Sequence, residues 1–355
     1  GQAAIAQAGN TMTVSQQTDR LIAQWNSFNI GRDASVAFQQ PGVSSVALNR
    51  ILDQNPSQIF GSLAANGQVF LLNPAGVFFG PTARVDVGGL VASSLHLANE
   101  DFLAGKYSFA GSSTAGAIAN QGQIRTAEGG YVAFLSPRIV QEGTITAPRG
   151  TVAMAAGEKV DLDFTGDRLV HFTVTQGAID AQIANKGLIR ADDGLVMLTA
   201  KAADTLTQAV VNNDGVIEAA GLHERGGRIL LDAEGGQTTV AGTLDASSAE
   251  GRGGRIVATG DRVLIASGAH LTASGATGGG EVLVGGSWQN SDPAVRQAVG
   301  TVVETGALLE ANATDRGDGG TVVAWSDVTN PGSVTRAYGA FEAKGGPAGG
   351  DGGRI

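Results

Sequence analysis

Two pairs of neighbouring acidic residues have a spacing that could support catalysis. Asp161 and Asp163 lie two positions apart, which would place both on one face of a strand, whereas Asp192 and Asp193 are adjacent, as in a turn. Sugar-cleaving enzymes use two carboxyl groups about 5–9.5 Å apart on either side of the scissile bond. The sequence supplies spacing but no groove, so we expect a solvated face and a turn, and no enzymatic activity.

The other candidate residues for chemistry are scattered. The four histidines show neither the H-x-x-x-H spacing nor the cysteine partners of a zinc site; they are His96, His171, His223 and His270. The sequence contains no G-x-x-x-x-G-K-[ST] loop for nucleotides and no G-x-S-x-G nucleophile motif. We therefore expect no metal and no cofactor, and we expect each histidine to lie on the surface or to be satisfied in the core.

The composition excludes several classes of partner. The 355 residues carry a net charge of −10, and no two Lys or Arg residues are adjacent, which argues against a surface that binds nucleic acid. No apolar run approaches the about 18 residues of a membrane span, so we expect no membrane insertion. With 54 glycines, 42% apolar residues and only 16% charged residues, the chain is typical of many short strands joined by turns.

From about residue 118 the chain repeats a two-part motif eight times. The first part carries an apolar residue followed by Ala, and the second is Gly, one further residue, then Val or Ile. Successive copies start 20 to 44 residues apart, a period typical of solenoids. The first parts are 123–127, 143–147, 187–191, 215–219, 242–246, 269–273, 307–311 and 339–343, and the second parts begin at Gly130, Gly150, Gly194, Gly227, Gly254, Gly280, Gly320 and Gly353.

These repeats predict an all-β fold, a right-handed parallel β-helix in which like residues lie over like. We expect one continuous domain over 1–355, since no linker or shift in composition divides the chain. Within it, 1–40 would form an N-terminal cap that covers the open end of the coil. Residues 41–117 would form the first coils and 118–355 the glycine-rich coils.

Other segments fit this coil in particular ways. Asn120, Asn185 and Asn213 precede their repeats by a similar offset and could form a ladder of side-chain amides at a corner. The stretches 82–110, 157–184 and 286–300 do not follow the repeat, so we expect them to leave the coil as loops or hairpins, the first of them with a short helix.

The most sharply defined segment runs from Asn66 to Gly80. Its apolar run Val69-Phe70-Leu71-Leu72 shows no polar alternation, which suits a strand buried on both faces. Asn73, Pro74, Ala75 and Gly76 follow as a predicted tight turn, because proline fixes its own φ and glycine accepts a positive φ. A second apolar strand, Val77-Phe78-Phe79, completes the segment.

This segment and its neighbours carry a family likeness. The chain resembles the secretion domain of the filamentous-haemagglutinin family, in particular the high-molecular-weight adhesin type. The family motif reads Asn-Pro-Asn-Gly-Ile, and here Ala75 replaces the second Asn and Val77 the Ile; the loss of an amide puts in question any hydrogen bond from position 75. The matching residues are Asn73, Pro74, Ala75, Gly76 and Val77, with Asn49, Arg50, Asn55, Pro56, Ser57, Gln58, Asn66 and Gly67 in support.

The resemblance implies a function without catalysis. Such a domain is the N-terminal secretion and targeting module of a large adhesin-like exoprotein in a Gram-negative two-partner secretion system. The POTRA domains of a cognate outer-membrane transporter would recognise it, and it would nucleate β-helix folding outside the cell, giving a secreted or cell-surface protein that passes through the periplasm. Host or matrix glycans would be partners of the full-length protein.

Two alternatives remain on the sequence alone. One is a polysaccharide-binding or polysaccharide-cleaving β-helix, which requires an acidic or aromatic groove on one face of the coil. The other is a passive adhesin shaft, which the transporter would not recognise.

Overall fold

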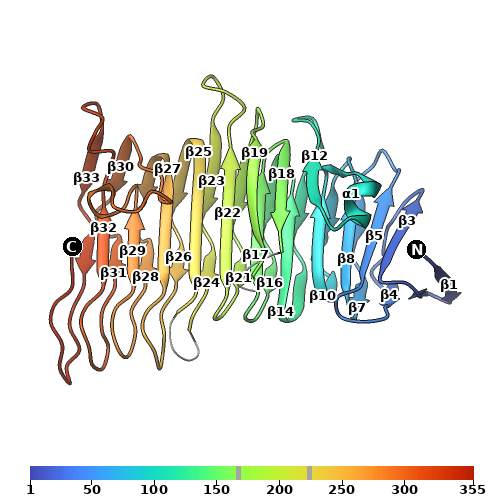
Figure 1. The fold of residues 1–355 in the computed structure, drawn as a ribbon, viewed down its shortest axis with the longest axis horizontal. Helices are drawn as coiled ribbons and strands as arrows, with labels where there is room; N and C mark the ends of the chain where they lie inside the picture. Colours follow the sequence, from blue (N-terminus) through green and yellow to red (C-terminus); the bar gives the residue numbers. More distant parts are fainter. Residues whose placement is uncertain (165–168, 222–225) are drawn as a thin grey trace. The chain divides into compact units, whose positions relative to one another are not determined.

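The computed structural model describes residues 1–164, 169–221 and 226–355. The chain forms two compact units, Gly1–Gln182 and Ile183–Ile355, and each consists of short strands joined by turns (Figure 1). The described helical segments are α1 (Asn99–Leu103) and the 3-10 turn η1 (Trp288–Asn290). None of these described segments is long and apolar enough to cross a bilayer.

The strands of the first unit are short, apart from β10 and β14. They are β1 (Ala3–Ala8), β2 (Thr11–Gln16), β3 (Arg20–Trp25), β4 (Ser35–Gln39), β5 (Val46–Ile51), β6 (Ser57–Ile59), β7 (Ser62–Ala65), β8 (Gln68–Leu72), β9 (Val77–Phe79), β10 (Arg84–Ser93), β11 (His96–Leu97), β12 (Tyr107–Ala110), β13 (Ile118–Asn120), β14 (Gln123–Leu135), β15 (Arg138–Gln141), β16 (Thr144–Thr146), β17 (Thr151–Ala156), β18 (Lys159–Asp163) and β19 (His171–Gln176).

The later strands follow the same pattern, with β25 and β27 the long ones. They are β20 (Gln182–Asn185), β21 (Leu188–Arg190), β22 (Leu195–Lys201), β23 (Ala209–Asn213), β24 (Val216–Glu218), β25 (Arg228–Val240), β26 (Thr243–Asp245), β27 (Arg255–Ile265), β28 (His270–Thr272), β29 (Glu281–Val284), β30 (Gly300–Val303), β31 (Leu308–Glu310), β32 (Thr321–Ala324), β33 (Val334–Ala337) and β34 (Ala340–Glu342).

In the first unit the strands stack in three parallel columns, which are the three faces of a coil. The first column runs β2, β4, β7, the start of β10, the start of β14, and β16. The second runs β3, β5, β8, the end of β10, the end of β14, and β17. The third runs β6, β9, β13 and β15. The predicted parallel β-helix is thus confirmed.

At the start of the chain, β1 pairs antiparallel with β2, and all its side chains are exposed. This reversed strand lies within the segment from which we expected the N-terminal cap.

The second unit has the same three-column arrangement. Its first column runs β21, β24, β26, β28, β31 and β34, in the register that the repeats predict. Ile189, Ile217, Leu244, Leu271 and Leu309 are partners along it, and all are fully buried. Like therefore lies over like, and the interior is a stack of aliphatic layers.

From Gly67 onward, glycine recurs at one corner of the described coils because successive backbones approach closely there. A Cβ atom built on Gly254 would lie 2.1 Å from the carbonyl oxygen of Gly227, far inside van der Waals contact. A Cβ would lie less than 3.0 Å from a backbone atom of the neighbouring coil at each glycine of two stacks, Gly67, Gly88, Gly130 and Gly150 in the first unit and Gly227, Gly254, Gly280, Gly320 and Gly353 in the second. The second part of each repeat begins with glycine for this reason.

Buried amides occupy another corner, as expected from the three asparagines. In the second unit, Asn185 Nδ2 donates to Asn213 Oδ1 at 2.6 Å. In the first unit, Asn120 Nδ2 donates instead to Gln141 Oε1 at 2.7 Å, and Gln141 continues to the carbonyl of Gly143. All four amides are fully buried. The amide ladder is confirmed within each unit, with glutamine as an additional rung.

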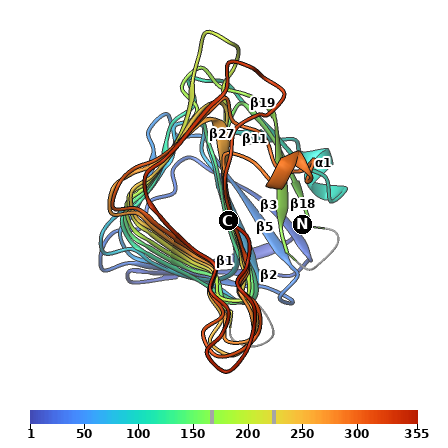
Figure 2. The same cartoon turned by 90° about the vertical axis from the view of Figure 1, so that its left-hand side faces the viewer.

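The expected excursions leave the coil, but 82–110 does so only in part. Strand β10, at the start of this segment, belongs to the first two columns, because it pairs in parallel with β7, β8 and β14, and the chain departs after it. In the first unit, β11, β12, β18 and β19 form a separate antiparallel sheet, and with α1 it lies beside the coils in the end-on view (Figure 2). The outward-facing ring of Phe70 packs against Phe102, Tyr107 and Phe109, with centroids 5.7–6.5 Å apart. This outer sheet explains why the strand from Val69 to Leu72 is buried on both faces, as predicted.

The excursion 286–300 in the second unit is held by charge and aromatic contacts. Arg296 Nε lies 3.0 Å from the Asp232 carboxylate, and its Nη2 lies 3.0 Å from Glu234. The Trp288 ring packs on Trp325 with centroids 5.6 Å apart. Together these contacts cover a small apolar cluster that includes Val257.

The glycine stack gives a stability prediction. We expect Gly254→Ala to lower the free energy of unfolding by about 2–3 kcal/mol, because the new methyl group forces two coils apart. Gly300→Ala is the matched control, since a Cβ there meets only Arg262 Cγ at 3.9 Å, and we expect a change within about 0.5 kcal/mol. Urea unfolding of both variants measures the difference; equal midpoints would contradict this account of the corner.

Candidate functional site

Asn73, Pro74, Ala75 and Gly76 form the predicted turn at the corner between β8 and β9. The Gly76 N–H donates to the Asn73 carbonyl at 2.8 Å, which closes the turn. The Ala75 N–H donates to Asn73 Oδ1 at 2.9 Å, as in an Asx turn. Asn73 is fully buried, whereas Pro74 is exposed and Ala75 is half-buried.

The Asn73 side chain joins this turn to the preceding coil. Its Nδ2 donates to the Asn55 carbonyl and to Ser57 Oγ, both at 3.0 Å. Its backbone N–H donates to the Ser93 carbonyl in the following coil at 3.0 Å. Through its side chain and its backbone N–H together, Asn73 therefore connects three successive coils.

Gly76 is required by both conformation and space. Its φ is +109°, a region that side-chain-bearing residues rarely adopt. A Cβ there would also lie 2.4 Å from the carbonyl oxygen of Ala117 in the next coil. The Gly116 N–H donates to the Pro74 carbonyl at 2.8 Å, so the following coil rests directly on the turn.

The two departures from the family motif are accommodated locally. Ala75 contributes its backbone N–H to the turn, so no side-chain amide at this position is needed to close it. Val77 is buried in the core, where it is paired with Ser57 below and Ile118 above. An aliphatic side chain is all that its position demands.

The supporting residues 55–58 lie directly beneath the motif turn. Ser57 is buried and accepts the bond from Asn73, whereas Asn55, Pro56 and Gln58 are exposed. The Gln58 backbone N–H donates to Asn29 Oδ1 at 2.8 Å. The sequence-predicted residues of two neighbouring coils thus meet at one corner.

Asn49 is an interior residue of β5. Its Oδ1 accepts a bond from Trp25 Nε1 at 2.9 Å, and its Nδ2 donates to the carbonyls of Ala47 and Phe70 at 3.1 and 3.2 Å. The amide is fully buried with its hydrogen bonds satisfied, and it ties the early strand β3 to β5 and β8.

Arg50 points away from the interior, toward the excursion. Its Nε donates to Asn99 Oδ1 at 2.8 Å, Nη1 lies 3.2 Å from His96 Nδ1, and Nη2 donates to the Leu97 carbonyl. Because guanidinium can only donate, His96 Nδ1 must carry a lone pair. Burial, and then the charge of Arg50, lower the pKa of His96 below its usual value, so the imidazole is neutral in this arrangement.

Asn66 and Gly67 lie at a different corner, away from the motif turn. Asn66 exchanges hydrogen bonds with the Gln40 backbone, at 2.7 and 2.8 Å. The Gly67 N–H donates to Gln40 Oε1 at 3.0 Å, and Gln40 Nε2 in turn donates to Gln16 Oε1 at 3.1 Å. These two residues therefore hold the glycine corner and do not contribute to the motif turn.

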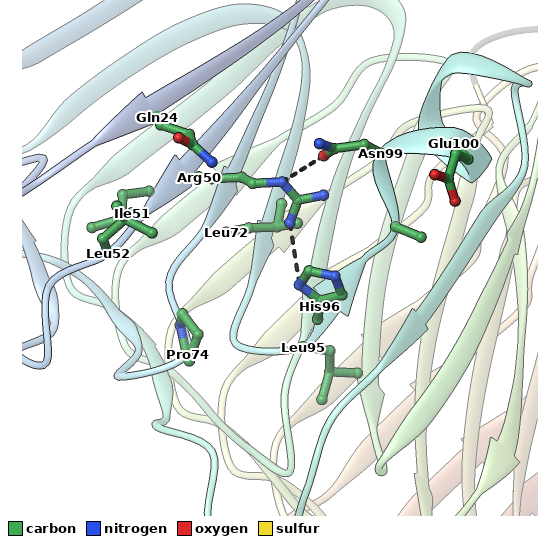
Figure 3. Close-up of a pocket in the computed structure, with 11 residues that line it drawn as sticks. Gln24, Arg50, Ile51, Leu52, Leu72, Pro74, Leu95, His96, Asn99 and Glu100 are labelled. Atoms are coloured by element: carbon green, nitrogen blue, oxygen red, sulfur yellow. Dashed lines mark hydrogen bonds between the residues drawn. The ribbon is translucent and has the colours of Figure 1, made fainter.

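A cleft of about 460 Å³ lies beside the motif turn, within the first unit (Figure 3). Arg50 forms its floor, and His96 and Asn99 approach from the excursion. Its apolar wall consists of Ile51, Leu52, Leu72, Pro74, Leu95 and Ala98, and Gln24 and Glu100 complete the lining. The motif proline and the supporting arginine thus share one cavity.

The residues considered for catalysis lie elsewhere. Asp161 and Asp163 are on β18 of the outer sheet, on the face opposite buried Val160 and Leu162, and Asp192 and Asp193 form a turn in which Asp193 has a φ of 55°. Burial raises the pKa of Asp192. Neither pair lines the Arg50 cleft.

The histidines differ in their surroundings. His270 Nε2 lies 2.9 Å from Glu310 Oε1, and His171 is on β19. His223 lies outside the described residues. Among the described residues, no group of three or more metal-ligating side chains comes together.

Sequence reasoning missed the partners that come from distant segments. Gln40, Ser93, His96 and Asn99 all contact the predicted residues. Of these, only the polar start of the excursion, Asn99-Glu100-Asp101, gave a signal in the sequence, as a break in the apolar pattern.

Removal of the Asn73 amide should destabilise the corner. Asn73→Ala leaves Ser57 Oγ and the Ala75 N–H without their partner, and we expect a loss of about 2–3 kcal/mol in the free energy of unfolding. The exposed Gln58→Ala is the control, with an expected change within about 0.5 kcal/mol. Chemical denaturation of the purified chain measures this loss. If Asn73→Ala unfolded at the same denaturant concentration as wild type, the Asn73 amide would not stabilise the contact between coils.

The lowered pKa of His96 predicts a pH dependence of stability. The neutral imidazole contributes its full stabilisation above the unfolded pKa of about 6.5, and this contribution is lost as the pH falls through the lowered folded pKa. We expect His96→Asn, whose amide oxygen can accept from Arg50, to lose less stability than wild type between pH 7.5 and 5. Parallel urea titrations measure this difference, and identical pH slopes in the two proteins would refute it.

Comparison with known proteins agrees with this geometry. The chain is similar to the crystal structure of the HMW1 secretion domain from Haemophilus influenzae, with a TM-score of 0.86 and 27% sequence identity, over 99% of this chain and 91% of that one. It is 32% identical over 242 residues to a heme/hemopexin-binding protein of Haemophilus influenzae strain Rd, and 27% identical over 245 residues to another protein of that name from the same species. The chain spans 26% of the length of these two relatives.

The family match covers most of the chain. The sequence model of the TPS secretion domain matches residues 1–246, which include the motif turn, the Arg50 cleft and the outer sheet. The chain therefore belongs to the TPS secretion domain family, whose exoproteins leave Gram-negative bacteria across the outer membrane with the help of a cognate transporter.

Proposed function

We propose that this chain is the secretion and targeting module of a larger exoprotein, that the POTRA domains of its transporter recognise it through the corner formed by Asn73 to Val77, and that it nucleates β-helix folding outside the cell. In this role it performs no reaction. The two units act as one export domain, and adhesion to glycans or other ligands is left to the remainder of the full-length protein.

The observation that carries this proposal is the position of the motif turn. Asn73 connects three successive coils while Pro74 and Ala75 remain accessible at the surface. Because Pro74 and Ala75 are accessible, a partner protein can bind the turn. Because Asn73 links three coils, the turn can also fix the first coils in register. Each further coil then adds strands to a preformed edge, as in other solenoids.

The chemistry of the outer faces gives little support to a polysaccharide-cleaving enzyme. Such an enzyme needs two carboxyl groups across a groove. The acid pairs lie on an outer strand and in a turn, and the Arg50 cleft contains Glu100 as its single carboxylate. Membership of a secretion-domain family also favours the export role.

The proposal predicts a block in export. We expect deletion of Asn73 to Gly76 from the full-length exoprotein, co-expressed with its transporter, to reduce the secreted fraction at least about tenfold and to leave the protein in the periplasm. The measurement is quantitative immunoblotting of the medium and the periplasmic fraction. Purified POTRA domains should also lose affinity for the deletion variant.

A matched control separates recognition from stability. Gly254→Ala weakens a coil far along the chain and leaves the motif intact, so it should retain POTRA binding even if less folded protein accumulates outside. Normal secretion of the deletion variant would overturn the proposal. So would an equal loss of POTRA binding in the Gly254→Ala protein, because the effect would then arise from general instability.

A further inference from the structure

The Arg50 side chain carries a positive charge that its surroundings do not neutralise. It is only 9% exposed, and its three acceptors, the Asn99 amide, the His96 ring and the Leu97 carbonyl, are all neutral groups. Among the described residues, no carboxylate lies within ion-pair distance of its guanidinium nitrogens. A buried charge without a counter-charge is costly, and buried charges are normally paired.

The guanidinium also keeps donors free. Of its five N–H groups, three point to the acceptors named above, which leaves two. The group faces the cleft, whose about 460 Å³ falls within the range of small-molecule sites. Glu100 lies at the rim, on α1, apart from the guanidinium (Figure 3).

The walls of the cleft define the remainder of the ligand. Leu72 and Leu95 lie beneath its lining and are themselves buried, so the apolar surface open to a ligand is that of the exposed Pro74 and of Leu52, which has 61% of its surface exposed. An anion that is entirely polar would leave this apolar surface in water. A carboxylate attached to an apolar chain satisfies both the charge and the walls, and carboxylate is a group that arginine binds with two parallel hydrogen bonds.

We propose that this Arg50 cleft of the folded module is a binding site for a carboxylate carried on an apolar group. This binding goes beyond the export role: the cleft shares Pro74 with the motif corner, but it requires the assembled excursion that brings His96 and Asn99 to Arg50. Two sources share this chemistry, a small organic acid and an acidic side chain flanked by apolar residues in a peptide segment.

The test uses the purified, folded chain and sodium hexanoate as the probe. We expect saturable binding that shifts the Arg50 Nε–H resonance in NMR spectra, weakens as salt is raised, and is absent with hexanol and hexylamine. The peptides acetyl-Leu-Glu-Leu-amide and acetyl-Leu-Gln-Leu-amide distinguish the sources: preference for the Glu peptide over hexanoate identifies a peptide segment, and the reverse identifies a small acid.

Variants at the mouth avoid the risk of unfolding. Leu52→Glu places a negative charge beside the site on an exposed side chain and should weaken hexanoate binding at least about fivefold, whereas Leu52→Gln should stay within about twofold of wild type. Arg50→Gln should abolish binding, with circular dichroism confirming the fold. Absence of saturable binding to wild type, equal binding of hexanol, or equal affinity of the two Leu52 variants would overturn the proposal.

Discussion

The backbone of each coil satisfies its hydrogen bonds only through the coils on either side. This constraint underlies the features described above. Strands in every column must stay in register, so the aliphatic layers repeat, and where the chain turns most closely over itself only glycine fits, as at Gly254. At another corner, buried amides such as Asn185 and Asn213 supply hydrogen bonds that the turning backbone leaves open.

The motif turn satisfies the same constraint at a corner of the first unit where the next coil leaves to form an excursion. β10 is followed by β11, α1 and β12 before the chain returns at β13. The residues that stack on the motif turn from above, such as Gly116, therefore follow only after the excursion. Asn73 supports the turn with side-chain and backbone bonds in both directions, and Arg50 anchors the start of the excursion through Asn99 and Leu97. The motif turn is therefore a structural joint between coils.

The coil register and the motif turn could be predicted from the sequence. The contacts between distant segments could not, for physical reasons. The repeats specify a register because Ile and Ala recur at fixed offsets, and the turn at Pro74 and Gly76 follows from backbone restrictions on those two residues. The partners of Arg50 come from 46 to 49 positions further along the chain, and no local pattern indicates which coil an excursion will cover. The sequence did not predict that Gln141 belongs to the amide ladder, because the expected pattern contained only asparagines. Its side-chain amide nevertheless makes the same kind of bond, to Asn120. The division into two compact units also has no counterpart in the composition.

The central claim is that the exposed part of the motif corner is the surface that the transporter reads. A photoreactive amino acid in place of Pro74, compared with one in place of the 77%-exposed Val43 at the glycine corner of the same unit, tests this most directly when crosslinking to the transporter's POTRA domains is measured in the periplasm. The account predicts strong crosslinks from position 74 and background levels from position 43. Equal crosslinking from the two positions, or crosslinking from position 43 alone, would contradict it.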